Sequence, residues 1–434
     1  MLAAVERVAY ICPVIPGDSL MARTQVIVLG AGIVGTSVAL QLAKRGVAVT
    51  LVDKRGPGEE TSYGNAGVLE GNTLFPHAFP SRITALLRLA FKRAPEANYH
   101  LSFLPKVATW LLAYRANTTL EESLKFAEKM RPLFANAIGE HETLMAESGA
   151  SRYLRKDGWL KVYREESSFQ ANARERELAS SLGLQHRELD VEQTRALEPS
   201  LSPVFRHAVH WPGAASVSNP LAVTKAYAAR FTQLGGIILK GDARTLTRAG
   251  DKWRVTTEAG VLDAPDVVIA LGPWAQDVLD PMGLKLPLKF KRGYHWHFRP
   301  RGNAGLTRPV VDVDNGYCLA PMEQGIRLTT GAEFADRDAP PTPVQFDRLL
   351  PDAKALFPLG DRVEPKPWMG SRPCFADSLP AIGPAPGKPG LWLCYGHAHW
   401  GLTLGPITGR LVADLVTGAT PFCDPTPYSI NRFG

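Results

Sequence analysis

The sequence predicts a mixed α/β protein of two domains, and three patterns support this. An apolar run over residues 25–29 is followed by glycines, an amphipathic helix and a second strand. A further strand, glycine loop and helix come near the C-terminus, over 391–415. Between them lie a helical pattern over 120–148 and an alternating, strand-like segment over 294–298. At 434 residues the chain exceeds what one core usually holds, which favours two domains.

Composition is that of an ordinary globular protein, with 45% hydrophobic and 21% charged residues. The net charge is +7, but no block of five like charges occurs, so no nucleic-acid partner is predicted. The five cysteines include no CxxC pair, which argues against a zinc site or a disulfide framework and fits a reducing cytoplasm. No run reaches the roughly 18 apolar residues of a membrane span.

Residues 1–21 are predicted to be a disordered extension. The apolar stretch 8–15 is interrupted by Pro13 and lacks a small-residue cleavage pattern, which disfavours a signal peptide. Met21 stands directly before the first strand, so a misassigned start is the alternative interpretation.

The first glycine motif predicts a dinucleotide site. The run 25–29 is typical of a parallel strand buried on both faces. The helix after the glycines ends at Gly46, and a second strand over 47–52 ends on Asp53, which follows Gly35 by 18 residues. That spacing is close to the roughly 20 residues of the dinucleotide fingerprint, whereas a structural turn is the alternative.

Each part of this motif has a physical role. Gly30 permits the tight turn, Gly32 lets the backbone approach a pyrophosphate, and Gly35 lets the helix pack closely on the strand. The helix N-terminus offers N–H groups and positive dipole to the phosphates. Asp53 can accept the hydrogen bonds of a ribose diol and would repel a 2′-phosphate. The backbone expected at the phosphates is that of Gly30, Ala31, Gly32, Ile33, Val34 and Gly35.

Two more stretches are candidates for cofactor contact. The polar, glycine-rich segment after Asp53 could lie along an extended cofactor, although alone it also fits a simple loop. Near the C-terminus, the strand 391–395 and the helix predicted over 407–415 flank a glycine loop, whose helix N-terminus could stabilise negative charge. The candidate residues are Lys54, Thr61, Ser62, Asn65, Ala66, Gly67, Gly396, His397, Gly401, Leu402 and Thr403.

These motifs resemble the amino-acid oxidoreductases of the D-amino-acid oxidase superfamily, and most closely the bacterial D-amino-acid dehydrogenases. The resemblance rests on the glycine fingerprint, the Thr61-to-Gly67 stretch and the segment from Leu286 to Tyr294. It also includes the Gly-x-Arg-Pro motif at 370–373 and the loop that begins at Gly396. In order along the chain, these motifs cover nearly everything after residue 20.

The resemblance implies a Rossmann-like FAD-binding domain interleaved with a substrate domain that combines an antiparallel sheet with helices. The FAD domain would comprise 22–75, 200–280 and 365–425, and the substrate domain 76–199 and 281–364, with a tail at 426–434. The strand over 266–271, with Gly272, is similar to the one that closes flavin domains. FAD would be noncovalent, because relatives with a cysteinyl flavin place the cysteine elsewhere than Cys374.

Two residues are assigned to catalysis from the resemblance. Arg372 corresponds to the arginine that holds the substrate carboxylate, a role that suits a planar guanidinium. A structural salt bridge is the alternative. Tyr317 resembles a substrate-facing tyrosine, and a buried core tyrosine is the alternative. Arg292 and Tyr294 could touch the flavin or the pocket, or could be exposed strand residues.

No histidine is assigned as a base, because hydride transfer with loss of the amine proton to solvent needs none. His397 and His399 are therefore expected to serve packing or backbone hydrogen bonds. Neither this pair nor His207 and His210 has a third ligand nearby in sequence, so no metal is predicted.

The predicted function is oxidation of a small amino acid, with the D configuration favoured, to an imino acid and 2-oxo acid, with electrons passed to quinone or a similar acceptor. The alternatives are an O2-using oxidase of glycine, sarcosine or an imino acid, a nonredox FAD-binding subunit, and an NAD-dependent dehydrogenase. The segments 82–93 and 101–114 mix apolar, aromatic and basic residues. They predict peripheral contact with the inner face of the cytoplasmic membrane, or else a face that packs on the protein's own core.

Overall fold

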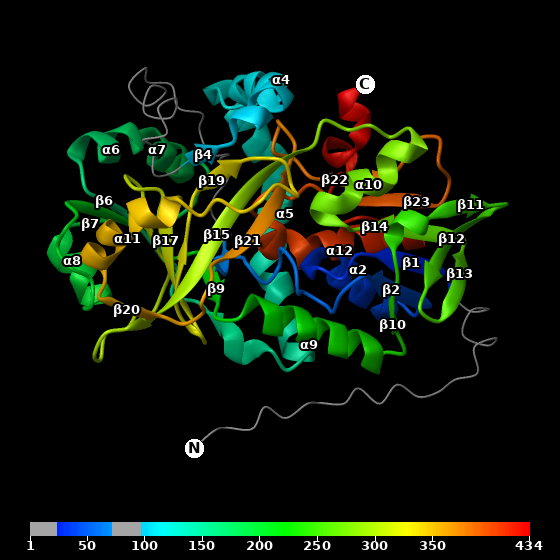
Figure 1. Ribbon diagram of the computed structural model, residues 1–434, viewed down its shortest axis with the longest axis horizontal. Coiled ribbons are helices and arrows are strands. Elements are labelled where there is room, and N and C mark those ends of the chain that lie inside the picture. Colours follow the sequence, from blue (N-terminus) through cyan, green and yellow to red (C-terminus); the bar gives the residue numbers. More distant parts are fainter. Residues whose placement is uncertain (1–23, 72–96) are drawn as a thin grey trace.

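The computed structural model describes residues 24–71 and 97–434 and confirms the mixed α/β class. Two β-sheets lie side by side, one around β1 (Val26–Leu29) and β2 (Val49–Asp53) and the other around β15 (Lys289–Pro300) and β17 (Tyr317–Met322) (Figure 1). The expected extension 1–21 and the basic helical segment 82–93 fall outside the described residues.

The smaller sheet has six strands, and it contains both glycine motifs. Its order is β10 (Ile237–Lys240), β2 (Val49–Asp53), β1 (Val26–Leu29), β14 (Asp266–Ile269), β23 (Leu391–Tyr395) and β22 (Ala381–Pro384). The first five strands are parallel and β22 is antiparallel to β23. This is the open parallel sheet that the first motif predicts.

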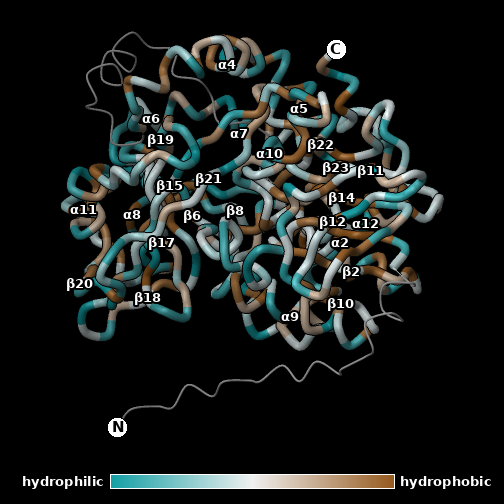
Figure 2. Tube along the Cα trace, turned by 45° about the vertical axis from the view of Figure 1, so that its right-hand side comes forward, coloured by the Kyte–Doolittle hydropathy of each residue, from teal (hydrophilic) through white to brown (hydrophobic). Residues whose placement is uncertain are grey.

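The two faces of this sheet belong to different hydrophobic cores. Val26 and Val28 face a core shared with α2 (Ile33–Lys44), α5 (Leu120–Glu147), α9 (Pro220–Gln233) and α12 (Gly401–Thr417). Ile27 and Leu29 face a second core, shared with α10 (Ala275–Leu279) and the meander of β11 (Thr247–Ala249), β12 (Lys252–Thr257) and β13 (Gly260–Ala264). Figure 2 shows hydrophobic segments around β14, α12 and α2. The unbroken apolar run at 25–29 is explained by burial on both sides.

The larger sheet has 11 strands. Its main path runs β4 (Ala97–Tyr99), β19 (Ala332–Phe334), β15 (Lys289–Pro300), β18 (Gly325–Thr329), β17 (Tyr317–Met322), β16 (Val310–Asp312), β6 (Trp159–Tyr163), β8 (His207–Trp211) and β7 (Arg187–Leu189). β20 (Leu359–Arg362) and β21 (Trp368–Cys374) also pair with β15. Most pairs are antiparallel, and α11 (Gln345–Leu356) packs on the sheet.

The division of the chain between two domains stays a prediction. β8 and β21 lie inside the ranges 200–280 and 365–425, yet both pair in the larger sheet. A small sheet of β3 (Val68–Leu69), β9 (Ala215–Val217) and β5 (Leu154–Arg155) joins the two halves. The remaining α-helices of the described residues are α4 (Leu104–Ala116), α6 (Glu166–Ala171), α7 (Ala173–Ser181) and α8 (Val191–Leu197).

The last helix begins earlier than the sequence predicts. α12 starts at Gly401 and not near 407, so Gly401, Leu402 and Thr403 form its first turn. Pro406, which reads as a helix breaker, lies inside the helix and has no N–H for the Leu402 carbonyl. His141 of α5 supplies the missing donor, with Nε2 at 2.8 Å from that carbonyl oxygen. A residue distant in sequence therefore makes the proline tolerable.

The C-terminal tail is docked on the core. Tyr428 is buried and its hydroxyl donates to the Lys129 carbonyl at 2.6 Å, while Arg432 pairs with Asp377 at 2.7 Å. Among the helices of residues 24–71 and 97–434, none has the length and hydropathy needed to cross a membrane.

Candidate active site

Three neighbouring strands point their carboxyl ends at one cavity. β1, β14 and β23 are adjacent and parallel, and they lead directly into Gly30, Gly272 and Gly396. The chain runs from β1 to β2 on one side and has β14 on the other, which is the switch point where open parallel sheets bind ligands. The cavity holds about 1850 Å³. Pockets for drug-sized ligands occupy roughly 300–1,000 Å³, so this one has room for a long cofactor and a substrate.

The three fingerprint glycines have different surroundings. Gly30 has φ +103°, and a Cβ there would lie 2.5 Å from the Ala270 oxygen. A Cβ on Gly35 would lie 1.8 Å from the Gly30 oxygen. Gly32 is different, because its Cβ would meet only the Ser62 hydroxyl, at 3.3 Å. The fold itself requires Gly30 and Gly35, whereas Gly32 keeps cavity space open for a ligand.

Asp53 is held in place by backbone donors. One carboxylate oxygen accepts the Ala31 N–H at 2.6 Å and the other accepts the Arg55 N–H at 2.7 Å. Burial raises the pKa of Asp53, and these hydrogen bonds oppose the shift. Each oxygen retains a second acceptor site, so the carboxylate can still receive hydroxyl donors from a ribose.

The segment 61–67 lies between the two glycine elements. The Ser62 hydroxyl accepts the Ile33 N–H at 2.9 Å, at the start of α2. Asn65 donates from Nδ2 to the His399 carbonyl at 3.3 Å, in the loop before α12. The Thr61 hydroxyl donates to the Ser371 carbonyl of β21 at 3.3 Å. This position suits a segment that follows an extended cofactor.

The N-terminus of α12 faces the same cavity. Its N-cap residue, Trp400, makes no side-chain cap. His397 is buried, its Nε2 lies 3.2 Å from the Thr408 hydroxyl, and burial lowers its pKa to about 3. A histidine that stays neutral in this way fits the packing role expected of it. Gly409 allows α12 to touch α2, because a Cβ there would lie 2.7 Å from the Ser37 carbonyl carbon.

Most of the predicted cofactor residues line the cavity. They are Gly30, Gly32, Ile33, Val34, Asp53, Lys54, Thr61, Ser62, Asn65, Ala66, Gly272, Gly396, His397, Gly401 and Leu402. Ala31, Gly35, Gly67 and Thr403 are not among the lining residues and support the walls. The Thr403 hydroxyl, for example, accepts the Glu70 N–H and donates to the Val68 carbonyl, both at 3.2 Å.

Arg372 reaches the cavity from β21 without an acidic partner. Its guanidinium lies over Gly293 of β15, where a Cβ would be 2.5 Å from Nη2. Nη1 donates to the Gly331 carbonyl at 3.3 Å. Within residues 24–71 and 97–434 no carboxylate pairs with it, and burial lowers its pKa. The alternative of a structural salt bridge therefore has no support in the described chain.

Tyr317 lines the same cavity, but its hydroxyl is hydrogen-bonded to Arg164, which is not among the lining residues. The hydroxyl accepts a hydrogen bond from Arg164 Nη2 at 3.4 Å, and Arg164 pairs with Asp312 at 2.8 Å. Burial and the nearby Asp312 carboxylate raise the pKa of Tyr317. The side chain belongs to a hydrophobic core, which favours the core interpretation. Its contact with a substrate stays a prediction.

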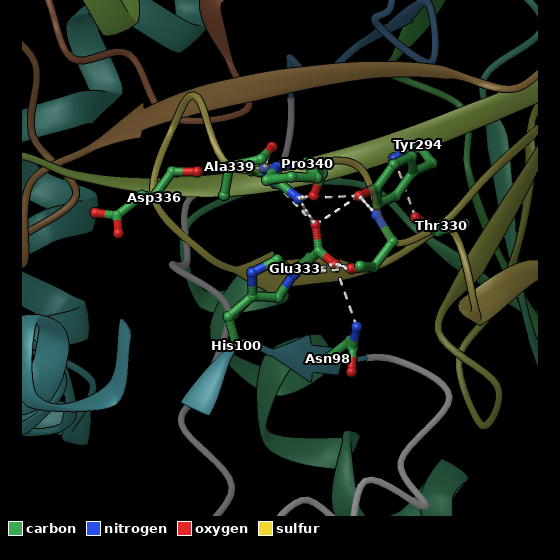
Figure 3. Close-up of polar contacts among 10 residues, drawn as sticks. Asn98, His100, Tyr294, Thr330, Glu333, Asp336, Ala339 and Pro340 are labelled. Carbon is green, nitrogen blue, oxygen red and sulfur yellow. Dashed lines mark hydrogen bonds and ion pairs between the residues drawn. The ribbon is translucent and has the colours of Figure 1, made fainter. Parts of the chain in front are cut away.

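Arg292 and Tyr294 are buried, so the interpretation as exposed strand residues is wrong. Arg292 donates from Nε and Nη2 to one oxygen of Glu333, at 2.8 and 2.6 Å. The Tyr294 hydroxyl donates to the same oxygen at 2.6 Å (Figure 3). Arg292 also donates to the carbonyls of Asp336, Ala339 and Pro340. The pair thus anchors the loop after β19.

That loop is the main part of the site that sequence reasoning missed. Its residues 337–341 line the cavity, and Arg337 pairs with Asp277 of α10 at 2.9 Å. The cavity is also lined by Lys291 of β15 and by Leu104, Leu111 and Tyr114 of α4. Lys291 stands inside the recognised 286–294 segment and could have been noticed; the loop carries no local motif. No group of three or more potential metal ligands occurs in the described part of the chain.

Comparison with known proteins identifies similar chains. The family model described as FAD dependent oxidoreductase matches residues 25–415. A D-amino acid dehydrogenase of Paramagnetospirillum magneticum is 32% identical, over 94% of this chain and 99% of the relative. A D-amino-acid oxidase of Bradyrhizobium diazoefficiens is 29% identical, over 94% and 98%. The crystal structure of glycine oxidase from Geobacillus kaustophilus superposes with a TM-score of 0.72 at 24% identity, covering 94% of this chain and 98% of that one.

Proposed function

The chain belongs to the FAD dependent oxidoreductase family, and on this premise we propose that it oxidises the α-carbon of a small D-amino acid. Family membership confirms the predicted FAD cofactor and the predicted enzyme class. It also disfavours two of the alternatives, the nonredox FAD-binding subunit and the NAD-dependent dehydrogenase. Noncovalent attachment remains part of the proposal.

The residues present fit FAD. The open space at Gly32, the Asp53 carboxylate and the N-termini of α2 and α12, whose N-cap residues make no side-chain hydrogen bond, all border one cavity. The turn at Gly30–Gly35 would hold the pyrophosphate and Asp53 a ribose, while the N-terminus of α12 would stabilise negative charge at the flavin. Bound FAD would supply a two-electron acceptor.

One observation carries the substrate proposal: Arg372 is a cavity-facing arginine with no acidic partner among the described residues. Arg372 is half-buried, and a partly desolvated guanidinium without a counter-ion is costly. A substrate carboxylate would supply the missing charge through two hydrogen bonds. Gly293 leaves room for the guanidinium beside β15. The carboxylate would thereby fix the position of the neighbouring α-carbon.

The oxidation removes a hydride from Cα and one proton from the amine, which leaves a C=N bond. Water then hydrolyses the imino acid to a 2-oxo acid and ammonia. The cavity histidine His397 has its pKa lowered to about 3 by burial, so it is neutral and does not hold the amine proton. In this proposal the amine enters neutral and its proton leaves to solvent.

For the electron acceptor we propose membrane quinone. Four leucines of the segment 101–124 have large exposed fractions: Leu101, Leu112, Leu120 and Leu124. Leu101 precedes α4, Leu112 lies in α4 together with Lys106 and Arg115, and Leu120 and Leu124 lie in the first turns of α5. Apolar side chains beside cations suit an anionic lipid surface. However, Phe103, Val107, Trp110 and Tyr114 of the same stretch pack in a core, as the alternative interpretation states.

An O2-using oxidase is the second candidate, because relatives include proteins named D-amino-acid oxidase and glycine oxidase. Cosedimentation with anionic liposomes at low and high salt, beside O2-consumption and quinone-reduction assays, separates the two. Binding at low salt with quinone reduction supports the dehydrogenase. No binding together with rapid O2 consumption leaves the oxidase.

The reaction class is tested by the spectrum of the purified protein. Anaerobic addition of a small D-amino acid should remove the flavin band at ~450 nm, and release of the 2-oxo acid should match the flavin reduced. Arg372→Ala should retain the band but not lose it on addition. A flavin that no amino acid reduces contradicts the proposal.

A further inference from the structure

Two cations stand opposite each other on the face of the sheet that borders the cavity. Lys291 of β15 and Arg372 of β21 are direct antiparallel partners in register. Side chains of such partners leave the same face, with Cβ atoms about 4.5–5.5 Å apart. Both residues line the cavity, as does Gly293, two positions along from Lys291 on that face.

Arg292, the next residue along β15, is a cation that is neutralised within the protein. Arg292 leaves the strand on the other face, where Glu333 neutralises it and the carbonyls of Asp336, Ala339 and Pro340 accept its remaining donors. Lys291 has no such partner, since no carboxylate of residues 24–71 and 97–434 lies within ion-pair distance of it. Its ammonium lies instead over the Tyr114 ring, 3.8 Å from the centroid.

Two like charges placed directly opposite destabilise a sheet. The charges of Lys291 and Arg372 both reach the buried thiol of Cys374. Burial raises the pKa of this thiol, and each of the two cations lowers it. The α-carboxylate of an amino acid brings one negative charge, which leaves one of the two cations unmatched. A second carboxylate in the same cavity would match the remaining cation.

We propose that the substrate is an amino acid whose side chain carries a carboxylate, with Arg372 binding the α-carboxylate and Lys291 the second one. This inference rests on the proposed function and adds the substrate class to it. The Arg372 guanidinium lies over Gly293 and the Lys291 ammonium lies over the Tyr114 ring, and both Gly293 and Tyr114 line the cavity, so a dicarboxylate bound there would meet both cations. Lys291 is therefore the specificity-determining residue.

The test compares acids with their uncharged isosteres. Aspartate, asparagine, glutamate and glutamine are each added, in both configurations, to the anaerobic FAD-loaded full chain, and the apparent second-order rate of flavin reduction is measured. The wild type should reduce faster with the acid than with the amide by a factor of roughly 10–100, the range for a hydrogen bond to a charged group. Salt should lower this ratio.

Lys291→Gln should bring the acid-to-amide ratio close to one, and Lys291→Arg should restore most of it. Lys252→Gln is the matched control, because it removes one exposed positive charge on β12, away from the lining residues. FAD content and Tm of each variant report whether it is folded.

Three results would overturn the inference. If the wild type prefers the amides, or if Lys291→Gln slows acids and amides equally, Lys291 does not bind a second carboxylate, although amino-acid oxidation stands. If no amino acid in either configuration reduces the flavin, the proposed function fails as well.

Discussion

Gly32 and Gly35 belong to the same fingerprint, but substituting them should have opposite consequences. Gly32 has φ −65° and ψ 176°, which any residue can adopt, and its Cβ would meet only the Ser62 hydroxyl at 3.3 Å. Gly32→Val should therefore fold, with a change in the free energy of unfolding within about 1 kcal/mol, because loss of glycine entropy offsets the tight contact. Its branched side chain would occupy the space that the cofactor pyrophosphate needs.

Gly35→Ala should instead damage the fold. Its Cβ would lie 1.8 Å from the Gly30 oxygen and 3.0 Å from the Ala270 Cβ, and one of these contacts is to backbone. Overpacking costs about 1–3 kcal/mol where neighbours can move, and a backbone oxygen at this distance places the cost at or above the upper end.

The assay measures the ~450 nm absorbance per protein chain, and Tm with and without added FAD. FAD at 100 times its Kd should stabilise the wild type by about 2.7 kcal/mol. Gly32→Val should have a near wild-type apo Tm that FAD does not raise, and Gly35→Ala a low Tm in both conditions. A Gly32→Val protein that remains fully yellow, or that unfolds like Gly35→Ala, would refute the reasoning.

Three further substitutions test the site and its supports. Arg372→Ala should keep FAD but lower kcat/KM by a factor of about 30 to several thousand, with little recovery in Arg372→Lys, which lacks the planar fork; an unchanged kcat/KM contradicts the carboxylate role. Glu333→Ala leaves the buried Arg292 unpaired and should lower the free energy of unfolding by about 3–5 kcal/mol in urea titrations, whereas a loss below 1 kcal/mol argues against the anchor. His141, with its pKa lowered to about 4 by burial, stays neutral in the folded state while the unfolded state takes up a proton below about pH 6.5. The free energy of unfolding should thus fall as pH drops from about 6.5 toward 4, and His141 should account for about 2 kcal/mol of this fall at pH 5. Between pH 7 and pH 5, His141→Gln should lose about 2 kcal/mol less of its free energy of unfolding than the wild type.

Local patterns were sufficient to predict the elements around the first glycine motif. The strand, glycines, helix and Asp53 follow one another within 30 residues, and each element depends on neighbours in sequence. The cofactor contacts assigned to these residues stay a prediction. The same holds for α5, predicted over 120–148 and found at Leu120–Glu147.

The remaining features depend on residues distant in sequence. The start of α12 could not be predicted from Pro406, because the donor that replaces its N–H is His141. The role of Arg292 is set by Glu333, 41 positions away and on another strand. The loop 337–341 reaches the cavity only because Arg292 and Arg337 hold its two parts.

The contact between α2 and α12 has a consequence for cofactor binding. At Gly409 the helices touch backbone to backbone, so the spacing of their N-termini is fixed before any ligand binds. At Gly405, one turn into α12, a Cβ would lie 3.1 Å from the Ile33 side chain, so the two helix N-termini open onto the cavity next to each other. A negatively charged group bound between them would meet the positive ends of both helix dipoles without any movement of the helices.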